Sequence, residues 1–425
     1  MKAGAATVDI TPRVGRELSG FAMRLQPSTG VLDPLAARAL YLETGGERLL
    51  WLHCDLIAVG EETVARFRRW ARQNFGLEAA QVLLTATHTH AGPASITLKE
   101  AGARDQPYLE SLDENLQAAA ECALLAVEPC EMVATEGHCA LAVHRRGPAT
   151  AHTDPRVASV GFRRPNGTFL AVVVNYAIHP VALGHVNRLI SGDIFSAAAA
   201  AVSRGLPGCP VVLMTNGACG NINPPEVNVP WSRVQEWGAL IAAAVGPGLK
   251  AAQVSPHPHL ETARRLVPLP LDWLDAAGIE TAIARTLETV PDEGFGRKVR
   301  ACVRAWGEEL HAALAEGRAA RTREVELQAI RLAGITFVGV NAEVFSHFGD
   351  WLRRDTGLAK VYPVGYANGD MGYLCTREAY GEGGYEVDMA HIFYGGYRFA
   401  AGALEQLAGE AASLVGALSA SPVVG

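Results

Sequence analysis

The sequence lacks the features that mark a disulfide-rich, membrane-spanning or nucleic-acid-binding protein. Its eight cysteines include no Cys-x-x-Cys pair, so neither a zinc knuckle nor a disulfide scaffold is indicated, and a reducing compartment fits best. No segment approaches about 18 uninterrupted apolar residues, and residues 1–7 contain no continuous apolar stretch typical of a secretion signal. Basic residues form no cluster, and 37 basic against 44 acidic side chains give a net charge of -7, which argues against nucleic-acid partners. We therefore expect a soluble, cytoplasmic protein without integral membrane association.

The order of apolar segments predicts an α/β fold. The chain has 425 residues, of which 49% are hydrophobic, so a large core is possible. Strand-like segments alternate with amphipathic segments of helical spacing, which indicates a mainly parallel or mixed β-sheet flanked by helices. Strands are expected at residues 5–10, 35–42, 48–57, 172–179, 211–214, 324–332, 335–340 and 361–366, and helices at residues 61–74, 108–127, 194–202, 231–252 and 399–418.

Two further segments stand apart from this alternation. Residues 272–321 are helical in pattern, charged and alanine-rich, and we expect an inserted helical excursion that packs on the sheet and carries no chemistry. Residues 368–385 form a long loop rich in glycine and tyrosine, of the kind that closes over a site.

The first candidate site follows an apolar strand that begins at Val82. His88 and His90 are two residues apart, and Gly92-Pro93 ends the strand just beyond them. Because side chains alternate along a strand, both histidines are expected on one face, about 7 Å apart along the chain. This arrangement suits a metal ligand and its neighbour. Two hydrogen-bonded histidines at a strand end are the alternative.

A second strand ends in a histidine as well. His179-Pro180 follows the apolar run 172–178, and a rigid strand behind a histidine is what a metal ligand requires, although a structural histidine gives the same pattern. Asp193 lies in or beside the first turn of the next helix, where simple N-terminal capping is the alternative to a functional role.

Two later positions add polar groups. The loop 215–225 is punctuated by glycine, asparagine and proline, and its exposed N–H groups can form an oxyanion site or merely connect two elements. Glu343 follows the strand 335–340 and either caps the next helix or completes a His/His/Glu ligand set suited to zinc.

Taken together, these segments resemble the neutral/alkaline ceramidase family, as a bacterial-type member with the catalytic domain alone. The likeness covers nearly the whole chain and rests on residues 8–12, 37–39, 87–93, 179–180, 189–193 and 220–224, Glu343, Tyr373 and Tyr385. It implies a catalytic domain with a mixed β-sheet flanked by helices and one zinc ion per chain. The ligands that it implies are His88, His179, Glu343 and Tyr373, with His90 beside the metal.

The sequence departs from that family in three respects. Ceramidases carry a catalytic serine at the position of Asn223. The chain also has no room for their C-terminal immunoglobulin-like domain and no secretion signal. We therefore expect one catalytic domain over residues 1–425 and regard ceramide itself as an unlikely substrate.

The resemblance implies a zinc-dependent hydrolase that cleaves an amide bond of a small or medium soluble N-acyl compound. Zinc lowers the pKa of a bound water to about 7, so that no serine nucleophile is needed. His90 is expected to transfer a proton or stabilise an oxyanion, Asn223 to donate its amide N–H to the substrate carbonyl, and Tyr385 to contact the substrate. The alternatives are an ester or lactone hydrolase on the same zinc site, and a zinc-stabilised pseudoenzyme that binds an acyl-amide ligand without turnover.

Overall fold

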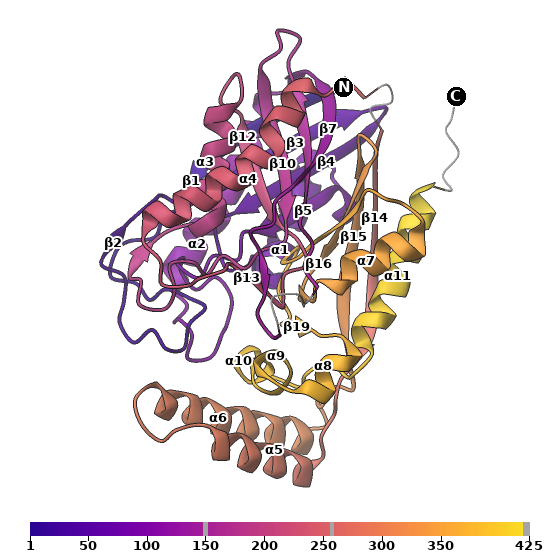
Figure 1. Ribbon diagram of the computed structural model, residues 1–425. Helices are drawn as coiled ribbons and strands as arrows, with labels where there is room; N and C mark the ends of the chain where they lie inside the picture. The colour runs from indigo at the N-terminus through magenta and orange to yellow at the C-terminus, as the bar shows by residue number, and fades with distance from the viewer. Residues whose placement is uncertain (148–151, 256–258, 420–425) are drawn as a thin grey trace.

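Three β-sheets meet in a central core, and each is covered on its outer face by a pair of helices (Figure 1). The computed structural model describes residues 1–147, 152–255 and 259–419. The predicted mixed α/β class is confirmed, with the strands divided among several mixed sheets.

The three main sheets each combine antiparallel neighbours with one parallel pair. The first has the order β5-β4-β3-β1-β6, the second β12-β10-β9-β7 and the third β14-β15-β16-β18, with β4/β5, β10/β12 and β16/β18 parallel. Their strands are β1 Lys2–Asp9, β3 Ala36–Thr44, β4 Glu47–Cys54, β5 Val82–Ala86, β6 Glu128–Pro129, β7 Glu131–His138, β9 Arg156–Arg163, β10 Phe169–Tyr176, β12 Val211–Asn216, β14 Leu260–Pro270, β15 Thr322–Leu332, β16 Ile335–Val340 and β18 Val361–Val364.

Three short pairs of β-strands, parallel or antiparallel, lie in the connections between the main elements. They are β2 Gly30–Val31 with β11 Leu189–Ile190, β8 Val143–His144 with β13 Ile222–Asn223, and β17 Glu343–Val344 with β19 Tyr373–Leu374. The β15/β16 hairpin turns at Ala333 and Gly334, both with positive φ.

Helices cover the outer faces of the sheets in pairs. The first sheet packs against α1 Glu61–Phe75 and α2 Gln106–Leu125, the second against α3 Asp193–Gly205 and α4 Trp231–Ala251, and the third against α7 His347–Thr356 and α11 Ala403–Ser419. No helix in the described part of the chain combines the length and apolar character needed to cross a membrane.

The central strands are buried on both faces, which explains why their sequences are continuous apolar runs. In β10, Val172 and Val174 pack with α3 and α4, whereas Val173 faces the other two sheets. Trp51 of β4 and Phe337 of β16 meet edge to face in the same central core, with ring centroids 5.6 Å apart. Side-chain alternation thus gives each strand one face toward a helix pair and one toward the neighbouring sheets.

The helical excursion forms a separate layer. Helices α5 Ala276–Thr289 and α6 Phe295–Ala315 pack on each other and lie below the main body, with α8 Arg377–Glu382, α9 Tyr385–Asp388 and α10 Ala390–Tyr394 between them and the sheets (Figure 1). Trp306 of α6 anchors this layer, because its indole N–H donates to Gly396 O at 2.8 Å.

A buried ion-pair network fixes the loop that follows β18. Glu326 accepts from Arg68 and Arg264, at 2.7 Å each, and from Asn368 Nδ2 at 2.9 Å. Glu326→Ala is expected to lower the free energy of unfolding by about 3 kcal/mol, because two guanidinium groups lose their carboxylate. Urea denaturation measures this effect.

A surface ion pair provides the control for that prediction. Glu236 pairs with Arg233 while 62% of its side chain is exposed, so Glu236→Ala is expected to change the free energy of unfolding by less than about 1 kcal/mol. Equal losses in the two variants would contradict a special role for the buried network.

Candidate metal centre and active site

The carboxyl ends of five central strands converge on one region of the molecule. Backbone hydrogen bonds join these ends: Gly217 N donates to Tyr176 O, Gly365 N to Asn216 O, and Asn368 N to Leu84 O, at 2.9, 3.0 and 2.7 Å. The segments after β5, β10, β12, β16 and β18 therefore deliver their side chains to a common site.

His88 does not lie in a strand, contrary to the prediction. Strand β5 ends at Ala86, and His88 has a φ of 67°, in the left-handed region. The backbone turns there because Thr87 N donates to Cys54 O and His88 N to Leu56 O. Strand alternation therefore does not place the two histidines. Their rings are nevertheless adjacent, with centroids 4.9 Å apart.

His88 and His179 present equivalent nitrogens to one carboxylate oxygen. Their Nδ1 atoms lie 2.8 Å from Ile57 O and 3.2 Å from Cys219 O, so each Nδ1 carries the hydrogen that is donated to a carbonyl. Each Nε2 then has a free lone pair, and both Nε2 atoms lie 3.5 Å from Glu343 Oε2. Burial lowers the pKa of His88 to about 3 and that of His179 well below its usual value, so both rings are neutral at pH 7.

Glu343 stands at the start of β17, directly beside Tyr373 of β19 in the parallel pair. Its Oε2 accepts from the Tyr366 hydroxyl at 3.2 Å, and its Oε1 from the Tyr394 hydroxyl at 2.7 Å. The pKa of Glu343 is raised to about 8, mainly because the carboxyl is buried and to a lesser extent because the Asp370 carboxyl lies nearby. A cation at Oε2 would offset this cost of ionisation.

His90 belongs to the same cluster. Its ligand nitrogen lies within 4.8 Å of those of His88 and His179, and neither of its ring nitrogens has a hydrogen-bond partner among the described residues. The ring packs edge to face against Phe21 at 4.8 Å. Two three-residue sets can thus hold a metal ion, since His88 and His179 combine with either His90 or Glu343.

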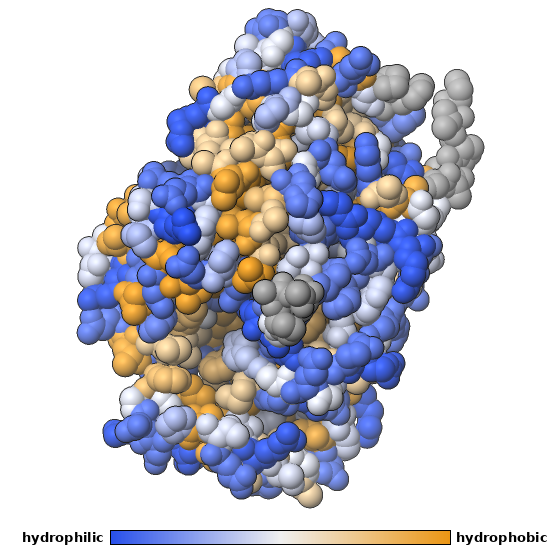
Figure 2. All heavy atoms as spheres, in the orientation of Figure 1, coloured by the Kyte–Doolittle hydropathy of each residue, from blue (hydrophilic) through white to orange (hydrophobic). Residues whose placement is uncertain are grey.

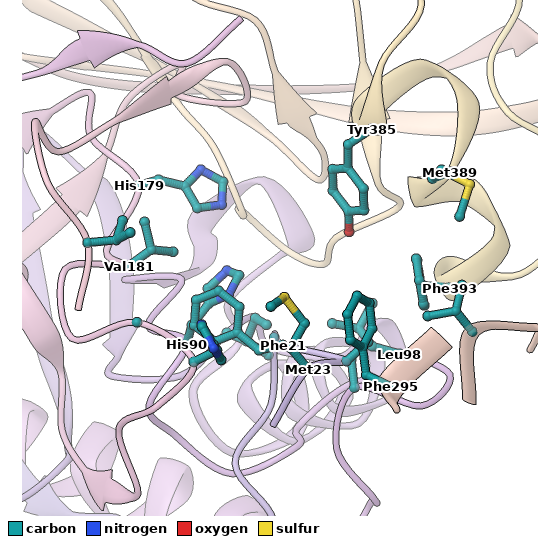
Figure 3. A pocket seen from close by; sticks show the side chains of 18 of the residues that line it. Phe21, Met23, His90, Leu98, His179, Val181, Phe295, Tyr385, Met389 and Phe393 are labelled. Atoms are coloured by element: carbon teal, nitrogen blue, oxygen red, sulfur yellow. The ribbon is translucent and has the colours of Figure 1, made fainter. Parts of the chain in front are cut away.

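These residues lie in the wall of a cavity of about 600 Å³ that also contains Tyr373, Asn223 and Tyr385. Figure 2 shows hydrophobic side chains gathered around the hollow above α5 and α6. In Figure 3 His90, His179 and Val181 lie on one side of the cavity and Tyr385, Met389 and Phe393 on the other. All seven residues expected at the site therefore border one cavity.

The helical excursion contributes to the same cavity. Val290, from the connection between α5 and α6, and Phe295 and Val299 of α6 form part of its lining. No chemistry was expected from this segment, and its contribution is an apolar wall that borders the space above the histidines. Nothing in the local sequence indicates this position.

Part of the chain that carries this site is similar in sequence to known proteins. The sequence model for the N-terminal part of the neutral/alkaline non-lysosomal ceramidases matches residues 1–207, which contain all three clustered histidines. The N-terminal half of the chain is thus similar to the neutral/alkaline ceramidases. It is 24% identical to neutral ceramidase B of Dictyostelium discoideum over 214 residues, and 25% identical to the neutral ceramidase of Pseudomonas aeruginosa over 213 residues.

These sequence matches are partial. Each covers 45% of this chain, but only 30% of the Dictyostelium ceramidase and 32% of the Pseudomonas ceramidase. The fold likeness extends further: the crystal structure of the Pseudomonas aeruginosa ceramidase covers 99% of this chain and 75% of its own, with a TM-score of 0.74 at 18% identity. A ceramidase complexed with C2 gives a TM-score of 0.76 at 17% identity, covering 99% of this chain and 76% of its own.

Arg145 is a site residue that the sequence analysis missed. Its guanidinium donates to Glu386 Oε1 at 2.7 Å, to the Tyr373 hydroxyl at 2.9 Å and to Asn223 Oδ1 at 3.4 Å. Because Oδ1 of Asn223 faces this cation, the amide nitrogen is left for another acceptor. The only local signal is the doublet Arg145-Arg146 after a short strand, which does not distinguish a buried arginine from a surface one.

Asp193 lies in the first turn of α3, as predicted, and does more than cap it. Its carboxylate accepts from Ala182 N and Leu183 N, at 3.3 and 3.1 Å, as well as from Ile194 N. Burial raises its pKa to about 6. Asp193 therefore fixes the loop that follows His179 and supports the position of that histidine.

Proposed function

We propose that this protein is a zinc-dependent hydrolase that cleaves an amide bond in an N-acyl compound. The observation that carries the proposal is the convergence of three lone-pair donors, His88 Nε2, His179 Nε2 and Glu343 Oε2, at 3.5 Å from nitrogen to oxygen. Buried lone pairs so arranged repel one another unless a proton or a metal cation lies between them, and two imidazole nitrogens with a carboxylate oxygen suit a metal cation. The similarity of residues 1–207 to the neutral/alkaline ceramidases supports the assignment of the reaction to amide hydrolysis.

His88, His179, Glu343 and Tyr373 are the ligands in this proposal. Nitrogen and oxygen donors of this kind are preferred by zinc, which when bound polarises a carbonyl and activates water near neutral pH. Tyr373 is included because it is paired in register with Glu343 and its hydroxyl faces the Arg145 guanidinium.

The remaining polar groups act on the substrate. Burial lowers the pKa of His90 well below its usual value, so its neutral ring, with both nitrogens unoccupied, can accept a proton beside the ligands. Asn223 Nδ2 can donate to the carbonyl oxygen of the scissile amide, because Oδ1 is held by Arg145. Tyr385, with 49% of its surface exposed, contacts the part of the substrate nearest the cavity mouth.

The cavity indicates the kind of N-acyl compound. Its volume of about 600 Å³ is in the usual range for small-molecule sites, which is roughly 300–1,000 Å³. Its walls are mainly apolar, with Phe21, Met23, Leu98, Phe295 and Phe393 among them. We therefore propose that the acyl group lies against these side chains and that the amide carbon lies beside His90.

An activity screen tests the reaction type. N-acyl amides of increasing chain length are compared with the matching esters, using the zinc-loaded protein, the chelated protein and the chelated protein after zinc is restored. We expect amide turnover that is lost on chelation and recovered with zinc. Turnover of esters alone would favour the esterase alternative, and zinc-dependent binding of amides without turnover would favour a pseudoenzyme.

A further inference from the structure

The hydroxyl of Tyr394 links the carboxyl groups of Glu343 and Asp370 through hydrogen bonds. The hydroxyl oxygen of Tyr394, the last residue of α10, lies 2.7 Å from Glu343 Oε1 and 2.7 Å from Asp370 Oδ2. Asp370 is itself held, because its Oδ1 accepts from Gly372 N at 3.0 Å. Its Oδ2 lies 4.0 Å from His88 Nδ1.

The backbone makes room for this contact. Gly372 has a φ of 90°, and a Cβ there would lie 3.1 Å from the ring of Tyr394. A side chain at position 372 would therefore both strain the backbone and displace the tyrosine ring. The loop between Asp370 and Tyr373 is thus shaped around Tyr394.

The contact has a direct consequence for Glu343. The terminal torsion of a glutamate is soft, so burial alone does not determine which oxygen faces a given direction. With Oε1 bonded to Tyr394, Oε2 is turned toward His88 Nε2 and His179 Nε2. The Tyr366 hydroxyl also reaches Oε2, but at 3.2 Å it is the longer contact.

We propose that Asp370 and Tyr394 form a clamp that positions Glu343 as a metal ligand and so determines how tightly the metal is held. This inference rests on the metal site proposed above. Hydrogen-bond partners behind metal ligands typically change metal affinity by roughly 10- to 100-fold when they are removed. Neither residue is needed to touch the metal or the reacting bond.

The two clamp residues differ in their relation to the substrate cavity, which Tyr394 also borders. Asp370 does not border that cavity but a smaller one of about 190 Å³, together with Glu61, Arg323 and Tyr394. A change at Asp370 therefore leaves the lining of the substrate cavity intact. Altered metal retention in such a variant cannot be attributed to a reshaped substrate site.

The test measures zinc affinity by competition with a chelator, using zinc alone and no substrate. Tyr394→Phe removes both hydrogen bonds and keeps the ring, and it is expected to weaken zinc binding by roughly 10- to 100-fold. Asp370→Asn is expected to retain nearly wild-type affinity, because an amide can donate to the Tyr394 oxygen while that hydroxyl donates to Glu343. Tyr397→Phe is the matched control, because the Tyr397 hydroxyl donates to Leu274 O and contacts no residue of the clamp.

The outcomes separate the clamp from the metal site. Zinc binding by Tyr394→Phe as tight as in the wild-type protein would overturn the clamp and leave the metal site standing. Wild-type protein that takes up no zinc would overturn the metal site and the clamp together. Thermal unfolding of each variant identifies a loss of zinc affinity that comes from misfolding. In that case the visible spectrum of the cobalt-loaded protein decides, and a spectrum unchanged by Asp370→Ala refutes the clamp.

Discussion

Replacing His88 with alanine is expected to reduce the zinc content of the purified protein from about one ion per chain to near zero. The reason is geometric: His88 Nε2 is one of only two neutral imidazole nitrogens that lie 3.5 Å from Glu343 Oε2 among the described residues. His179→Ala removes the other and should have the same effect. Metal analysis of the purified variants gives the result, and amide turnover should fall to background in both.

Two further variants decide which three-residue set holds the metal. Glu343→Ala should also lose zinc, whereas His90→Ala should keep it and reduce turnover by roughly 100-fold through loss of a proton-transfer group. If His90→Ala loses zinc while Glu343→Ala retains it, the ion is held by His88, His90 and His179, and the assignment of Glu343 is wrong.

Much of the fold could be predicted because hydrophobic periodicity reports local structure directly. The apolar runs at β10 and β15 and the amphipathic spacing of α1 each gave an element close to its observed bounds. The division into three sheets could not be predicted in this way. It depends on contacts such as that of Trp51 with Phe337 in the central core, which join segments far apart in the chain.

The candidate site was predictable where a side chain follows a strand end. His179 and Glu343 follow β10 and β16, and a residue at that position is delivered to the same edge of the fold as its counterparts. His88 lies beside His90 as expected, but its position comes from a left-handed backbone turn rather than from strand alternation.

Other parts of the site have no local sequence signal. Arg145 follows the two-residue strand β8, and Tyr394 ends the five-residue helix α10. Each becomes part of the site through contacts with residues more than 50 positions away. The apolar wall that α5 and α6 supply has no local sequence signal either. The sequence pattern of an amphipathic helix pair does not depend on the part of the protein against which the pair packs. Long-range packing, rather than local propensity, determines these contributions.

Asn223→Ala is expected to lower kcat by roughly 100- to 1,000-fold while zinc stays bound, which is the range for loss of one oxyanion donor. Asn223 borders the cavity with its Oδ1 held 3.4 Å from Arg145 Nη1, so the substitution removes a donor aimed at the substrate but no metal ligand. Steady-state kinetics on the amide found in the screen, together with metal analysis, measure both quantities. Asn166→Ala, in the exposed turn between β9 and β10, is the control and should leave kcat unchanged.

Asn223→Ser places a hydroxyl where the family resemblance sets the catalytic serine. Because zinc and His90 are expected to remain in place, this variant should keep measurable amide turnover, with less loss than Asn223→Ala if the hydroxyl can donate to the substrate carbonyl. We expect it to remain poor on ceramide, since the cavity walls from α5, α6 and the Phe21 loop are unchanged. Conversion of Asn223→Ser into an efficient ceramidase would show instead that this one side chain, and not the shape of the cavity, excludes ceramide.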